Sequence, residues 1–108
     1  MTQLIKLPHT GLEVPHTRYT LADVQHMTTR RGVAFNANVH EGTHRLGIIE
    51  NDGNGGDTAF YPLSRDGRIA MAEFIGACQL DGKRLREDQV LEQLLDEHSM
   101  AEAIAADP

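Results

Sequence analysis

The segment from Val33 to Glu50 alternates apolar and polar residues around Glu41-Gly42, and this pattern constrains the fold more than any other. Alternation with a period of two is typical of an antiparallel strand pair with one buried face. With Glu41-Gly42 as a two-residue turn, Val39 is predicted to pair with His44. The apolar face of this hairpin then consists of Val33, Phe35, Ala37, Val39, Leu46 and Ile48.

Other elements are indicated by changes of period and by turn residues. Apolar residues at intervals of three and four predict one helix over about residues 68–79, with the stripe Met71, Phe74, Ile75 and Cys78, and a second over about 86–98. Thr58–Tyr61 predicts a further strand. Thr20-Leu21-Ala22-Asp23 is similar to a capping box and predicts a short helix over 20–28.

Together these elements predict an α+β fold, with an antiparallel sheet of three to five strands packed on one face by two or three helices. A length of 108 residues suits a single domain over 1–108. Before residue 31, two Pro-His-Thr triplets punctuate short strands or extended segments, and the role of Met1–Arg31 stays open.

The composition excludes several classes of protein. One cysteine, Cys78, permits no intramolecular disulfide, and its place on the apolar stripe predicts a buried, inert thiol. No apolar run approaches the ~18 residues of a membrane span, so we expect a cytoplasmic protein without membrane contact. A net charge of −6 argues against direct binding of nucleic acid.

The segment His40-Glu41-Gly42-Thr43-His44 matches the H-E-x-x-H pattern of zinc hydrolases. That chemistry needs a helix, because only there do residues four apart point the same way. In the predicted hairpin the two imidazoles lie on opposite faces of the sheet. We therefore expect no metal, no cofactor and no catalytic residue here. A small zinc-dependent hydrolase using this pentapeptide is the alternative function.

A glycine-rich loop, Asn51–Asp57, follows the hairpin. It is not an EF-hand, because the twelfth position counted from Asp52 is Leu63 instead of an acid. It is not a phosphate loop, because no lysine follows Gly56. It is interpreted as a wide turn with positive φ at several positions, or as a contact surface whose polar members are Asn51, Asp52, Asn54 and Asp57.

The negative charge is concentrated at the C-terminal end. Residues 1–86 contain all 10 basic residues and 9 acids, whereas residues 87–108 contain seven acids and no lysine or arginine. Asp88, Glu92 and Asp96 lie four residues apart, and like charges so spaced destabilise a helix slightly. This arrangement indicates a solvated face or a negative surface that docks on a basic partner.

The stretch from Val33 to Tyr61, with its strand, turn, strand and NDGNGG loop, resembles small proteins of phages and other mobile elements. The resemblance implies an anti-defence inhibitor of the anti-CRISPR type. The sequence thus predicts a non-enzymatic protein that binds a protein partner, such as a nucleic-acid-binding complex, through Asp88, Glu92 and Asp96 and through the loop. It leaves the oligomeric state open.

Overall fold

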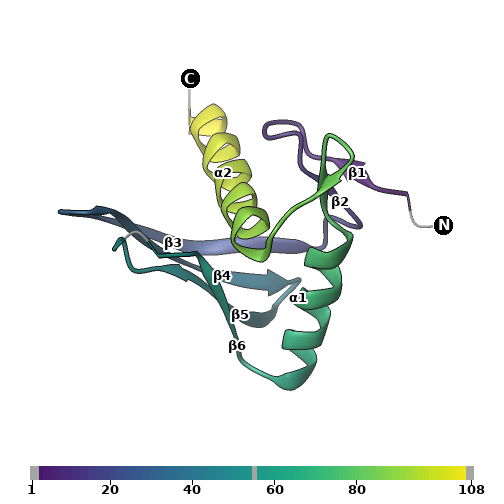
Figure 1. Cartoon of the computed structure of the whole chain (residues 1–108), viewed down its shortest axis with the longest axis horizontal. Coiled ribbons are helices and arrows are strands. Elements are labelled where there is room, and N and C mark those ends of the chain that lie inside the picture. The colour runs from purple at the N-terminus through teal and green to yellow at the C-terminus, as the bar shows by residue number, and fades with distance from the viewer. Residues whose placement is uncertain (1–2, 55, 107–108) are drawn as a thin grey trace.

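Two antiparallel sheets and two helices make up the computed structural model, which describes residues 3–54 and 56–106 (Figure 1). The α+β class predicted from the sequence is confirmed. The main sheet has the order β3-β4-β5-β6, and the small sheet has the order β1-β2-β7-β8. In chain order the elements are β1 (Ile5–Lys6), β2 (Glu13–Val14), β3 (Tyr19–Thr29), β4 (Gly32–Glu41), β5 (His44–Asn51), β6 (Ala59–Pro62), α1 (Arg65–Ala77), β7 (Gln79–Leu80), β8 (Lys83–Arg84) and α2 (Glu87–Ala106).

The helix predicted over 20–28 is wrong, because these residues belong to β3. β3 pairs with β4 along its length, from Tyr19 opposite Glu41 to Thr29 opposite Gly32. Asp23 occupies a β-bulge with φ +53°, where its carboxylate accepts a hydrogen bond of 2.8 Å from the Asn38 side chain. Long-range strand pairing therefore overrides the local capping signal.

The predicted β4–β5 hairpin is present, but its turn lies one residue later than expected. Glu41 pairs with His44 around Gly42-Thr43, and Gly42 has φ +61°, a conformation that favours glycine. A register shift next to Val39 then reverses the alternation in β5. Consequently Leu46 and Ile49 are buried where Leu46 and Ile48 were expected. Val33, also expected on the buried face, is 49% exposed at the end of β4 that pairs only with β3.

Both sheets and both helices contribute to one hydrophobic core. Met71, Phe74 and Ile75 of α1 and the Cys78 side chain after it are buried, as their spacing predicts. Ser64 caps α1 by accepting a hydrogen bond from the Gly67 amide at 3.0 Å. The core is made of Leu12, Val14, Val39, Leu46, Ile49, Met71, Phe74, Ile75, Cys78, Val90 and Leu91.

The second half of the chain contains a short hairpin and a long last helix. Asp81-Gly82 does not simply follow a helix but forms the turn of the β7–β8 hairpin, with positive φ at both residues. The last helix continues beyond His98 to Ala106, so Ser99-Met100-Ala101-Glu102 continues this helix and does not cap a new one. In the N-terminal segment, Met1 and Thr2 lie outside the described residues, while β1 and β2 pair as a short hairpin.

A carboxylate on α2 fixes the turn of this N-terminal hairpin. Glu97 accepts hydrogen bonds from the Thr10 amide (2.9 Å), the Thr10 hydroxyl (3.0 Å) and the His9 amide (3.2 Å). Burial opposes ionisation of Glu97, but these hydrogen bonds outweigh it and hold the pKa of the carboxyl below its ordinary value. The charge of Glu97 thus joins the N-terminal hairpin to α2.

We predict that Glu97→Gln lowers the free energy of unfolding at neutral pH by about 2 kcal/mol, because it removes charge-assisted hydrogen bonds. Because the pKa of Glu97 is lower in the folded protein than its ordinary value of 4.5, ionised Glu97 stabilises the fold at pH values above 4.5. This stabilisation is lost as pH falls through the pKa of Glu97 in the folded protein. Denaturant unfolding across this pH range should show the two proteins converging in acid. Glu102→Gln, on the exposed part of the same helix, is the control. Equal losses in both variants would contradict the role of Glu97.

Candidate binding surfaces

The acidic residues singled out on α2 follow one side of the helix, where Glu92 and Asp96 are exposed and the Asp88 side chain is 14% exposed, and the fold adds one more. Asp88, Glu92 and Asp96 lie on successive turns of the helix. Asp57, from the loop before β6, is close enough for its charge to act on both Glu92 and Arg86. We call these four residues, Asp57, Asp88, Glu92 and Asp96, the acidic strip. The structure thus unites part of the loop with the helix.

The charges of the acidic strip are only partly balanced. The Arg86 guanidinium contacts both carboxylate oxygens of Asp88, at 3.2 and 3.3 Å, and this hydrogen bonding lowers the pKa of Asp88. Glu92 forms no ion pair with any described residue. Partial burial, followed by the negative charges of Asp88, Asp96 and Asp57, raises the pKa of Glu92. Arg86 offsets only part of this effect, so the centre of the acidic strip retains like-charge repulsion.

The glycine-rich loop is a wide turn stabilised by its own side chains. Asn51 donates to the Gly56 carbonyl (3.0 Å) and to the Thr58 hydroxyl (3.1 Å), and it accepts from the Gly53 amide (2.8 Å). Asp52 accepts from the Asn54 amide at 3.0 Å. Among the described loop glycines, Gly53 alone has positive φ, which corrects the expectation of several such positions; Gly55 lies outside them.

The predicted contact residues of the loop are divided between two surfaces. Asp57 belongs to the acidic strip, whereas Asn51 and Asp52 line a concavity on the main sheet, and Asn54 is exposed on the loop. The amide of Asn51 is already used inside the loop. The loop therefore connects two surfaces.

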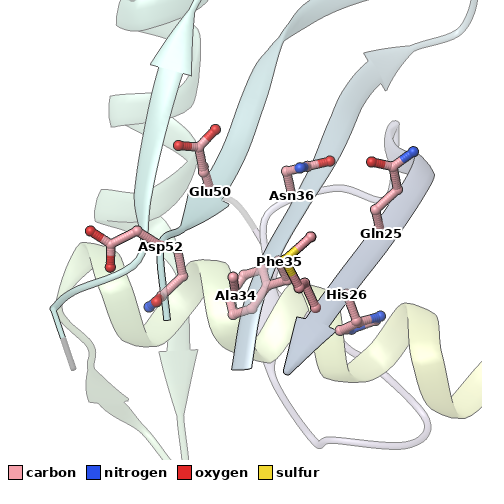
Figure 2. Close-up of a pocket in the computed structure, with 9 residues that line it drawn as sticks. Gln25, His26, Ala34, Phe35, Asn36, Glu50 and Asp52 are labelled. Carbon is pink, nitrogen blue, oxygen red and sulfur yellow. The ribbon is translucent and has the colours of Figure 1, made fainter. Parts of the chain in front are cut away.

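This concavity is a feature that the sequence analysis missed. It has a volume of about 560 Å³, and its walls include side chains from three adjacent strands (Figure 2). Gln25 pairs with Asn36, and Asn36 pairs with Glu50, so the three side chains form a row across the face opposite the core. The sheet concavity is lined by Gln25, Met27, Ala34, Asn36, Glu50 and Asp52, among others. The alternating polar residues of β4 were its signal in the sequence.

The H-E-x-x-H residues lie in the hairpin, as the sequence analysis predicted. His40 pairs with Arg45, and Glu41 pairs with His44, so the two histidines occupy adjacent register positions and point to opposite faces of the sheet. Because these residues form a hairpin and not a helix, the two imidazoles cannot bind one zinc ion as they do in the H-E-x-x-H motif. Within residues 3–54 and 56–106, no three His, Cys, Asp or Glu side chains cluster suitably for a metal ion.

Cys78 and His16, two further side chains with reactive groups, pack against neighbouring residues of the fold. Burial raises the pKa of the Cys78 thiol to about 12, which leaves it without thiolate character at neutral pH. The His16 ring packs against Tyr19 and Phe74 at centroid distances of 4.5 and 5.0 Å. Burial, with a smaller effect of Arg18, lowers the pKa of His16 and favours the neutral ring. The inert cysteine expected from the sequence agrees with these surroundings.

Comparisons with known proteins gave no match to a family model, to a curated protein or to a solved structure. Among the helices described, none has the length and apolar character required to cross a membrane.

We predict that Glu92→Gln stabilises the protein at neutral pH by about 0.5 kcal/mol, because it removes two like-charge pairs on the helix. A raised folded-state pKa means that Glu92 costs stability once pH exceeds its ordinary value of 4.5. Below that value Glu92 is protonated in both states, so the gain should vanish. Thermal unfolding at neutral and acid pH measures the difference. A variant no more stable than the parent at neutral pH would show that the strip is not repulsive.

We also predict opposite outcomes at two loop glycines. Gly53→Ala should destabilise the fold by about 2 kcal/mol, because φ there is +79° and a Cβ would lie 2.8 Å from the Ala34 amide nitrogen. Gly56→Ala should change stability by less than about 0.5 kcal/mol, since a Cβ at Gly56 meets no atom within 4 Å. Denaturant unfolding of both variants makes the comparison. Equal effects would refute this account of the loop.

Proposed function

We propose that this chain is a non-enzymatic binding protein whose acidic strip docks on a basic surface of a host macromolecule. The observation that carries the proposal is the convergence of Asp57 with Asp88, Glu92 and Asp96. Folding brings Asp57 within electrostatic reach of a helix face that already carries three acids, and the ion pair of Arg86 is made with Asp88. A cationic partner would offset the repulsion between Glu92 and the neighbouring carboxylates, so relief of this repulsion would favour the bound state.

The partner class that suits this chemistry is a protein with a groove for nucleic-acid phosphates. Such a groove presents lysine and arginine side chains at regular spacing, and carboxylates spaced along a helix can occupy it in place of phosphates. The resemblance of Val33–Tyr61 to small phage and mobile-element proteins supports an inhibitor of the anti-CRISPR or other anti-defence type. On this proposal the protein acts in the cytoplasm of a bacterial host, without direct contact to nucleic acid or membrane.

The test is a pair of charge-matched variants. Glu92→Lys/Asp96→Lys reverses the acidic strip, whereas Glu73→Lys/Glu102→Lys makes the same charge change at exposed positions elsewhere on α1 and α2. Each protein is immobilised and used to capture partners from bacterial lysate at low and high salt. We expect a captured protein that is released as salt rises, that is lost with the strip variant and that is retained by the control.

Two results would overturn the proposal. Capture that is unchanged by Glu92→Lys/Asp96→Lys would place the binding surface elsewhere. Equal loss in both variants would show that only the net charge of −6 matters, without a specific strip. Circular dichroism of each variant establishes that the fold is retained, so loss of capture reports on the surface alone.

A further inference from the structure

The outer part of the β3–β4 hairpin, residues 27–34, extends beyond the helices and is called the arm below (Figure 1). Met27 is 70% exposed and Val33 is 49% exposed on this arm. Met27 pairs with Ala34, and Val33 pairs with Thr28, so the two exposed apolar side chains lie at neighbouring register positions on opposite faces. A two-stranded ribbon uncovered on both faces is marginal on its own, and exposed apolar residues on it indicate a contact surface.

The tip of this arm carries two positive charges. Arg30 and Arg31 form the turn between Thr29 and Gly32, and both are exposed. Neither guanidinium makes an ion pair with any residue that the structure describes. The Thr29 hydroxyl donates a hydrogen bond to the Gly53 carbonyl at 2.9 Å. The oxygen of the same hydroxyl accepts a hydrogen bond from the Arg31 amide at 3.2 Å. The two arginines are therefore presented on a fixed turn.

The sheet concavity beside the arm has the opposite charge. Glu50 and Asp52 are its ionisable acids, and no lysine or arginine among the described residues lines it. The side chains of Gln25, Asn36 and Glu50 make no hydrogen bond within the described part of the chain, whereas nearby Asn38 is paired with Asp23. The strands are ~4.8 Å apart, so the row offers closely spaced oxygen acceptors.

A guanidinium group suits this concavity better than an ammonium group. It has five N–H donors in a planar fork, which can bind the Glu50 carboxylate and a neighbouring amide oxygen together. Its aliphatic stem can pack on apolar surface, which Met27 and Ala34 provide. The wall residues therefore select for an arginine side chain.

We propose that the Arg30-Arg31 turn of one copy of this chain occupies the sheet concavity of a second copy, forming a two-fold symmetric dimer. Charge complementarity between the tip and the concavity carries this assignment. The tip lies at the end of the arm, and Met27 and Ala34 of the arm line the concavity, so a two-fold axis near Met27 makes the contact reciprocal: each copy gives a tip and receives one. The contact also covers Met27. The acidic strip takes no part in it, so the dimer is independent of the proposed function.

The test exchanges charge between the two halves of the contact. Arg30→Glu/Arg31→Glu makes the tip acidic, and Gln25→Lys/Glu50→Lys makes the concavity basic; none of these four side chains bonds within the described part of the chain. Sedimentation velocity at concentrations up to about 1 mM measures the dimer, since millimolar dissociation constants are the weak limit of specific contacts. We expect the wild type to dimerise at low salt and each variant to dissociate at least about tenfold more readily.

Mixing the two variants gives the decisive result. In the mixed pair each acidic tip faces a basic concavity and each basic tip faces an acidic one, so we expect the dimer to return. Arg65→Glu/Arg68→Glu, with the same charge change on exposed residues of α1, is the control and should dimerise as the wild type does. A wild type that stays monomeric at low salt, or a mixture that stays monomeric, would overturn the proposal. Loss of the dimer in the control would do the same.

Discussion

The burial of one face of β4 and β5 beneath α1 and α2 is the interaction on which the rest of the structure depends. Val39 and Ile49 are fully buried there, against Met71 of α1 and Leu91 of α2. Full burial of side chains of this size contributes about 2 kcal/mol each. This contact fixes the position of α2, and α2 in turn anchors the N-terminal hairpin through Glu97.

The same packing decides how charge is distributed over the molecule. Because the inner face of α2 is committed to the core, Glu92 and Asp96 face outward, where the charge of Asp57 acts on Glu92. Because the helices cover only one face of the main sheet, the row of Gln25, Asn36 and Glu50 stays open on the other. The acidic strip and the sheet concavity are thus two consequences of one packing arrangement, connected by the glycine-rich loop.

Sequence patterns predicted the elements whose periodicity is strong and continuous. The α1 stripe of Met71, Phe74 and Ile75 is buried as expected, and the β4–β5 hairpin is present because alternation over eighteen residues suits no other element. The prediction failed at β3, where a local capping signal around Asp23 competes with pairing to a strand distant in the sequence. It also failed at the register of Ile48 and Ile49, because a bulge leaves no trace in the hydrophobic pattern.

The sequence by itself determined the α+β class, the hairpin around Gly42, the buried stripe of α1 and the concentration of acids after residue 86, since each depends on neighbours along the chain. Tertiary structure alone decided that Asp57 joins the acids of α2, that Asn51 is used within its loop and that Glu97 holds the N-terminal turn. Each of these depends on which segments lie side by side in space. Local patterns cannot encode such proximity, because it results from the packing of the whole core.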